Sequence, residues 1–159
     1  MNVKIRALIF FVLSAISFNA LALTITPTNL AFSAKGVLVI KAGLLPAVTC
    51  NVEFIGVTNS NNTATINSVS VTGSGLCASV TASGLPWTWT ATSLTNATIS
   101  GVKFSVAGTT CGSSPVTLNA VWLNAANTLI INPNQPVGSC VVQTLSLTPN
   151  PPLVVVPVP

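Results

Sequence analysis

The chain has 159 residues, of which only 4% are charged, whereas soluble proteins carry about 25%. Behind the first 22 residues the acidic and basic side chains are Lys35, Lys41, Lys103 and Glu53, and histidine is absent. Nucleic acid is therefore excluded as a partner, because binding it needs clustered Lys and Arg. Most proton-transfer catalysis is also excluded, because it needs titratable side chains such as His, Asp and Glu.

The first 22 residues are typical of a secretory signal peptide. Lys4 and Arg6 precede an apolar stretch over 7–16, and Ala20-Leu21-Ala22 forms an A-x-A cleavage site. The apolar stretch is too short for a transmembrane helix. We expect segment 1–22 to be removed, no transmembrane segment to remain, and the protein to be exported to the periplasm, the cell surface or the medium.

Behind this segment the sequence favours strands. Val, Thr, Ile and Ser alternate with period two, and Gly, Asn and Pro interrupt them. The expected strands are 29–33, 36–41, 51–58, 64–72, 78–82, 87–92, 97–100, 102–106, 115–123, 128–131 and 141–147. Short, regularly spaced strands predict an all-β fold, a disulfide-stapled sandwich or barrel, with 23–148 as a single domain.

The stretch SGLPWTWTATS over 83–93 holds Trp87 and Trp89. A spacing of two places both rings on one face of a strand. Two interpretations remain open: the rings pack between two halves of the chain, or they form a platform for an apolar ligand.

The chain repeats a pattern of four features. GVLVIKAG at 36–43 corresponds to GVKFSVAG at 101–108, and each octet leads to a Thr-Cys, an Asn-containing turn and a second cysteine. Duplication predicts two halves, 29–92 and 94–148; the alternative is convergent turn chemistry in a biased composition.

Four cysteines, Cys50, Cys77, Cys111 and Cys140, follow the signal segment. An even number in an exported chain indicates two disulfides formed in an oxidising compartment, and four cysteines allow three pairings. If the halves are duplicates, each closes its own loop, which gives Cys50–Cys77 and Cys111–Cys140.

The last eleven residues, 149–159, read PNPPLVVVPVP. Their prolines disfavour a central strand and favour polyproline II or a strand edge. An ordered tail lying along the domain and a docking peptide both remain open.

The chain lacks the residues from which most active sites are built. Glu53 has no second carboxylate for glycosidase chemistry, and the hydroxyls have no histidine base to activate them. Zinc and hard-metal sites need Cys/His sets or several carboxylates. We expect no catalytic residue, no metal site and no cofactor. Glu53 should point outward or pair with a lysine, and the lysines should protect strand edges from aggregation.

Three segments carry a resemblance to a known family: SGLC at 74–77, SGLPW at 83–87 and ATISGVKFSVAGTTCG at 97–112. Together with the position of Cys140 they resemble the secreted activators of alkane oxidation (PraB-like) of Gram-negative bacteria. The resemblance implies a small exported protein associated with growth on alkanes, and it supplies no catalytic residues.

The favoured hypothesis is a secreted, non-enzymatic accessory protein that assists contact with or uptake of an apolar substrate. Its partner would be an alkane or another apolar phase, to which a chain with few charges can adsorb at little desolvation cost. Two alternatives remain: a structural cell-surface or biofilm-matrix protein that self-associates, and a carbohydrate-binding β-sandwich that uses Trp87 and Trp89.

Overall fold

The computed structural model describes residues 21–159, and these residues fold into twelve strands and two short 3-10 helices. The predicted signal segment therefore lies almost wholly outside the described residues. The strands are β1 (Leu23–Thr26), β2 (Ala31–Ala42), β3 (Val48–Thr58), β4 (Thr63–Thr72), β5 (Val80–Ser83), β6 (Trp87–Ala91), β7 (Asn96–Val106), β8 (Thr109–Leu123), β9 (Thr128–Ile131), β10 (Gln135–Val137), β11 (Cys140–Asn150) and β12 (Val154–Pro157), and the helices are η1 (Gly75–Ser79) and η2 (Asn124–Ala126).

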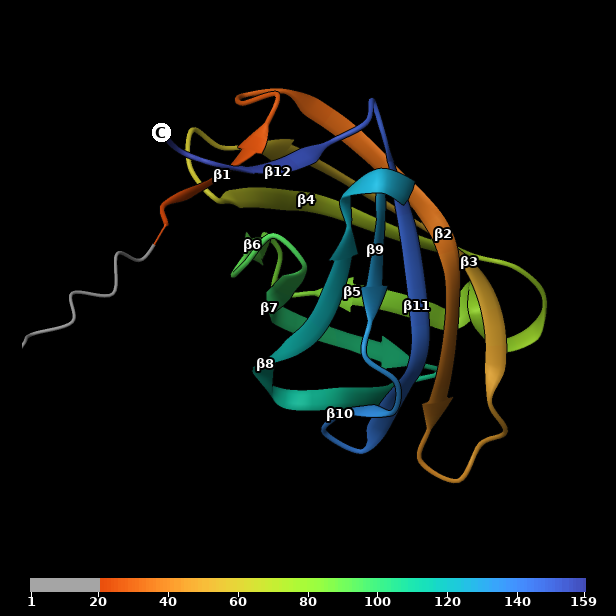
Figure 1. Ribbon diagram of the computed structural model, residues 1–159. Helices are drawn as coiled ribbons and strands as arrows, with labels where there is room; N and C mark the ends of the chain where they lie inside the picture. The colour runs from red at the N-terminus through yellow and green to blue at the C-terminus, as the bar shows by residue number, and fades with distance from the viewer. Residues whose placement is uncertain (1–20) are drawn as a thin grey trace, which may run out of the picture.

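Eight of these strands form a closed antiparallel barrel. Their order is β2-β3-β4-β6-β7-β8-β9-β11, and β11 pairs with both β9 and β2, so the sheet returns to its first strand (Figure 1). Of the other sheet strands, β5 pairs with the end of β7 and β10 with the start of β11. The predicted all-β, disulfide-stapled fold is confirmed, and of its two forms the barrel is the one observed.

Alternation of side chains along each strand fills the barrel. On β3, for example, Cys50, Val52 and Phe54 point inward and are buried, while Asn51 and Ile55 point outward. Inward-facing residues of every barrel strand join one apolar cluster that includes all three tryptophans. Burying one such side chain contributes about 1.5–3 kcal/mol, so the interior is the main source of stability in this weakly charged chain.

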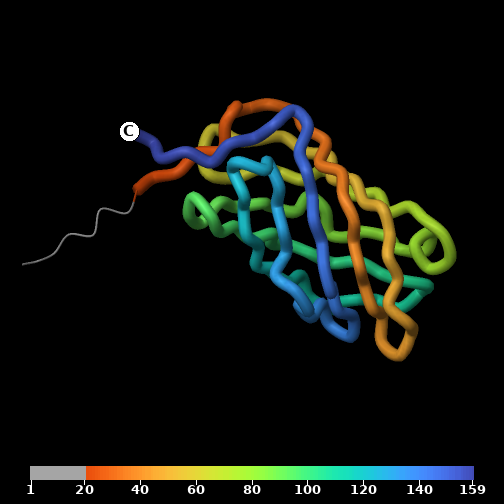
Figure 2. Tube along the Cα trace, turned by 45° about the vertical axis from the view of Figure 1, so that its right-hand side comes forward, coloured from red at the N-terminus to blue at the C-terminus, as the bar shows by residue number. Residues whose placement is uncertain are grey.

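The first and last described strands form a separate ribbon. β1 pairs with β12, from Leu23↔Pro157 to Thr26↔Val154, and Figure 2 shows these terminal strands side by side across one end of the barrel. Ile25, Leu153 and Val155 belong to the apolar cluster of the barrel interior and are almost fully buried. The proline-rich segment 149–159 thus contributes the end of β11 and a strand that closes one end of the barrel.

Two asparagines hold this terminal segment in place. Asn124 exchanges two hydrogen bonds with the backbone of Val155, each 2.9 Å long. Asn127 accepts from the Leu153 amide and donates to the Pro149 carbonyl. Both belong to the turn around η2, so the predicted Asn-containing turn of the second half serves as the clasp for the terminal segment.

The predicted halves correspond to two consecutive groups of barrel strands. Segment 29–92 supplies β2, β3, β4 and β6, and segment 94–148 supplies β7, β8, β9 and most of β11. The two repeated octets lie in β2 and β7, and each of these strands leads by a hairpin into a cysteine-bearing strand. This arrangement agrees with a duplication, which stays a prediction.

Two disulfides join Cys50 to Cys77 and Cys111 to Cys140, as the repeat predicted. Cys50 and Cys111 lie near the starts of β3 and β8, Cys140 begins β11, and Cys77 lies in η1. The antiparallel registers place all four at the same end of the barrel, opposite the β1–β12 ribbon. We call this end the disulfide end.

Removing one disulfide as the Cys50→Ala/Cys77→Ala pair should lower the free energy of unfolding by about 2–5 kcal/mol, because the unfolded chain regains the freedom of a long loop. The Cys111→Ala/Cys140→Ala pair should cost a similar amount, since the sequence separations, 27 and 29 residues, are nearly equal. Urea unfolding measures both, and an unchanged midpoint in either variant would contradict the expectation.

Candidate functional site

The tryptophan pair lies inside the barrel. β6 carries Trp87 and Trp89 inward, and their exposed fractions are 4% and 2%. Trp87 packs edge-on against Phe54, with ring centroids 5.8 Å apart. Trp89 packs edge-on against Phe32 and lies 5.1 Å from Trp122 of the second half. Trp87 thus packs against a ring of segment 29–92, whereas Trp89 reaches a ring of segment 94–148 as well. Both rings are buried, whereas a flat sugar platform needs exposed rings.

The three indole N–H groups differ in their hydrogen bonding. Trp87 Nε1 donates to the Ser83 carbonyl at 3.0 Å, and Trp122 Nε1 donates to Asn124 Oδ1 at 2.5 Å. Trp89 Nε1 is buried and has no acceptor among the described residues. Leaving a buried donor unpaired costs about 1–3 kcal/mol, so Trp89 fits its site less well than its two neighbours.

A small apolar cavity lies beside Trp87. Its volume is about 40 Å³, and every side chain that lines it is apolar, from Leu38 and Val52 on one wall to Phe104 and Leu118 on the other. An apolar cavity of about 150 Å³ stays dry and binds benzene. The preformed cavity is about a quarter of that size, so it admits a larger apolar molecule only if its wall moves.

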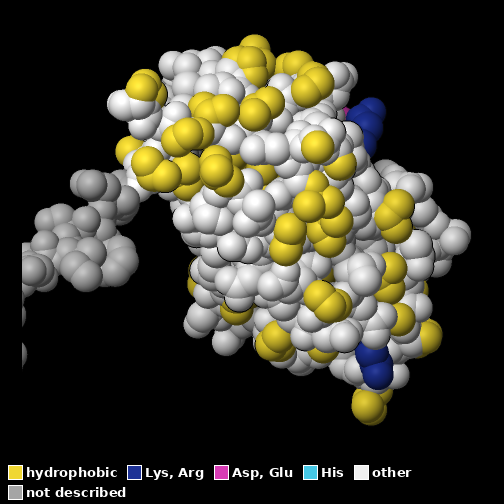
Figure 3. Space-filling model, in the orientation of Figure 1, with side chains coloured by type: hydrophobic (Ala, Val, Ile, Leu, Met, Phe, Trp, Pro, Cys, Tyr) yellow, Lys and Arg dark blue, Asp and Glu magenta, His cyan; other side chains and the backbone are white. Residues whose placement is uncertain are grey.

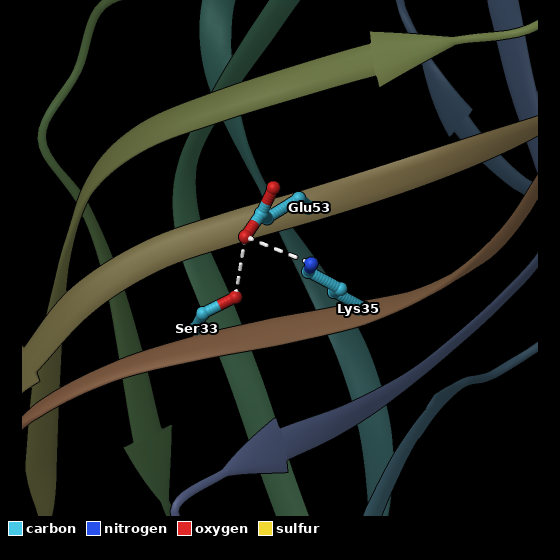
Figure 4. Close-up of polar contacts among 3 residues, drawn as sticks. All are labelled: Ser33, Lys35 and Glu53. Atoms are coloured by element: carbon cyan, nitrogen blue, oxygen red, sulfur yellow. Dashed lines mark hydrogen bonds and ion pairs between the residues drawn. The ribbon is translucent and has the colours of Figure 1, made fainter.

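The only carboxylate of the described residues lies on the outer surface, as the alternation of β3 predicted. Ser33 Oγ donates to Glu53 Oε1 at 2.6 Å, and Lys35 Nζ lies 3.7 Å from the same oxygen (Figure 4). Lys35 and Glu53 are cross-strand partners on β2 and β3, with side chains 74% and 33% exposed. An exposed pair of this kind contributes about 0.2–1 kcal/mol, so the cluster gives the sheet modest support.

The β2–β3 hairpin presents apolar side chains to solvent at the disulfide end. Its tip, residues 43–47, is exposed throughout, with Leu44 105% and Leu45 36% exposed. The tip is anchored where the Gly43 amide donates to the Ser139 carbonyl at 3.1 Å. Figure 3 shows hydrophobic side chains at the extremity of this hairpin below a basic one, and Lys41 is the exposed lysine at the end of β2.

Sequence reasoning missed this tip, although its signal is visible in the chain as GLLPA at 43–47, which begins with the last residue of the first octet. Two leucines next to Gly and Pro in a turn have no strand partner to cover them. Their exposure was therefore predictable from the turn chemistry.

Two features are absent from residues 21–159. No group of three His, Cys, Asp or Glu side chains lies close enough to hold a metal ion within this part of the chain. No helix among these residues is long and apolar enough to cross a membrane.

The chain matches a known protein family over almost its whole length. Residues 1–157 match the family described as "Alkane oxidation protein activator PraA/PraB-like", which confirms the resemblance drawn from the Gly-Leu-Pro-Trp and cysteine segments. No curated protein and no solved structure gives a significant match.

Substituting each tryptophan by phenylalanine should separate their contributions. Trp87→Phe and Trp122→Phe lose a hydrogen bond, whereas Trp89→Phe removes a buried donor that has no acceptor. Trp89→Phe should therefore be the least destabilising of the three, by about 1–3 kcal/mol relative to the others. Urea unfolding followed by circular dichroism measures the order, and the prediction is wrong if Trp89→Phe is the most destabilising.

Proposed function

Because this chain belongs to the PraA/PraB-like family of alkane oxidation protein activators, we propose that it is an exported, non-enzymatic accessory protein. In this role it assists contact with, or uptake of, an apolar substrate such as an alkane. The observation that carries the proposal is the hairpin tip, an exposed apolar segment on a rigid, weakly charged barrel.

The tip has the properties of an anchor for an apolar phase. Leu44 and Leu45 are exposed, and moving a leucine side chain out of water contributes about 1.5–3 kcal/mol. Lys41 lies behind them on β2, where its long stem can follow the apolar side chains while its ammonium group stays in water. The anchor to the Ser139 carbonyl next to Cys140 limits the conformational freedom that the tip loses on insertion.

The shortage of charge supports adsorption in a second way. A charged surface loses hydration when it meets a hydrocarbon, and that loss opposes binding. Residues 23–159 carry four charged side chains, of which Lys35 and Glu53 pair with each other. Many of the other exposed residues are Ser, Thr and Asn, whose desolvation costs less than that of ions.

Export is supported by the two disulfides, because such bonds persist in oxidising compartments. The expected signal peptide at 1–22 points the same way, to the periplasm, the cell surface or the medium. A non-enzymatic role is supported by the lack of His, Asp and Tyr behind this segment.

The fold gives little support to the alternative of a self-associating matrix protein. Pairing between copies needs a free strand edge, and the eight strands of the ring are paired with one another. The edges that remain are short: those of β5 and β10, strands of four and three residues, and the part of β4 beyond Ile66.

The proposal predicts that residues 23–159, purified with both disulfides, lower the hexadecane–water interfacial tension at micromolar concentration. The Leu44→Asn/Leu45→Asn variant should need about tenfold more protein or higher for the same effect, because two apolar anchors are lost.

The matched control is Leu94→Asn/Leu123→Asn, which changes two exposed leucines, 42% and 40% exposed, at the opposite end of the barrel. The control should behave like the unchanged protein. Failure of the unchanged protein to lower the tension would overturn the proposed function, and equal losses in both variants would overturn the role of the tip.

A further inference from the structure

The wall of the barrel is not hydrogen-bonded along its whole length. β4 pairs with β6 only over Thr63–Ile66, although β4 continues to Thr72. Beyond Ile66 the neighbour of β4 is β5, which lies next to it (Figure 1) and pairs only with β7. Among the described residues, the facing edges of β4 and β5 therefore share no ladder of hydrogen bonds. We call this slit, bounded by 67–72 and 80–83, the β4–β5 slot.

The apolar cavity reaches the surface at this slot. Most of the side chains that line the cavity are buried. The four exceptions are only half-buried: Val69 and Val71 on β4, and Val80 and Ala82 on β5. These four face one another across the slot, so the partial exposure of the cavity is confined to a place where the wall lacks backbone pairing.

From this geometry we propose that the β4–β5 slot is a lateral opening through which a linear hydrocarbon chain enters the barrel and lies against Trp87. The proposal rests on the proposed function, because it takes an apolar phase as the source of the chain. It goes further in placing a binding site inside the protein, whereas the hairpin tip acts at the surface.

The lining selects for a chain without polar groups. No lining side chain is polar or charged, and the one N–H at the cavity, that of Trp87, is already bonded to the Ser83 carbonyl. A ligand with a hydroxyl or carboxylate inside the cavity would leave that group unpaired, at a cost of kilocalories per mole. A narrow, flexible alkyl chain meets both requirements, small width and complete lack of hydrogen-bonding groups.

The slot is also where the wall opens most easily. The cavity of about 40 Å³ must expand to hold a chain. Parting any hydrogen-bonded pair of barrel strands breaks a ladder, whereas parting β4 from β5 separates only the side chains of small residues such as Val80 and Ala82. Expansion along this line therefore leaves the backbone hydrogen bonds of the ring in place.

Both ends of the slot are fixed, which limits its width and favours a thin ligand. At one end Ile66 pairs with Trp87 across β4 and β6. At the other end η1 connects the two edges, and Cys77 ties η1 to Cys50 of β3. This second end lies at the disulfide end, on the same side of the barrel as the hairpin tip, so a protein anchored by its tip holds the slot near the hydrocarbon.

The test uses 1-bromooctane, because bromine quenches tryptophan fluorescence only at close range and Trp87 is the one tryptophan that lines the cavity. The oxidised protein, residues 23–159, should show saturable quenching. Trp87→Phe should remove most of it, because Trp89 and Trp122 lie outside the lining. The bulky 1-bromoadamantane should fail to quench, since the slot is narrow.

Blocking the slot should abolish access to the cavity. Val71→Phe fills it from β4, and Ala82→Phe fills it from β5, and each should weaken 1-bromooctane binding by about tenfold or more. The matched control is Val37→Phe, the same change on the outer surface of β2, where the side chain is 46% exposed. This control should bind as the unchanged protein does. Near-ultraviolet circular dichroism identifies variants that keep the native packing.

The outcomes separate this inference from the proposed function. No saturable quenching in the unchanged protein, with interfacial activity intact, overturns the internal site and leaves the surface role standing. Loss of both activities overturns both proposals. Quenching that persists in a natively packed Val71→Phe or Ala82→Phe variant, or that falls equally in Val37→Phe, overturns the slot as the way into the barrel.

Discussion

The pairing of β11 with both β2 and β9 is the contact on which the rest of the structure depends. It converts an open sheet into a ring and gives the inward-facing side chains a common interior. A chain with one salt bridge among its described residues has little electrostatic stabilisation to use instead. Apolar burial, the backbone ladder and two disulfides must therefore hold the fold, and closure of the ring completes the burial of the interior.

Much of this architecture was predictable from the sequence. Period-two alternation located most strands, and the repeat gave the correct disulfide pairing. Closure was not predictable, because the β9–β11 contact joins strands with no distinctive sequence signal, so sandwich and barrel remained equally compatible. The separate strands expected at 97–100 and 102–106 form one strand, β7. Gly101 lies between them at a register irregularity, with a positive φ that only glycine adopts easily.

The candidate site was likewise predictable from the sequence only in part. The spacing of Trp87 and Trp89 placed both rings on one face but did not show which face lies inside. Strands β1, β10 and β12 were missed, because they are short and two of them contain proline. The slot was missed for a related reason: the sequence predicted that 64–72 is a strand but did not show that its partner β6 covers only part of it. The side chains of β4 become partly exposed where the β4–β6 ladder ends, and the length of that ladder is set by how the strands pair in three dimensions.

The ribbon of β1 and β12 has a consequence for the order of folding. Leu23 pairs with Pro157, so β1 has no partner until residue 157 has been made. The same delay applies to β2, whose second neighbour is β11. Contacts so distant along the chain form slowly, because the entropy cost of closing a long loop comes before any hydrogen bond stabilises the closed state. The early strands therefore spend synthesis with apolar faces uncovered, and uncovered apolar faces favour aggregation until β11 and β12 are added.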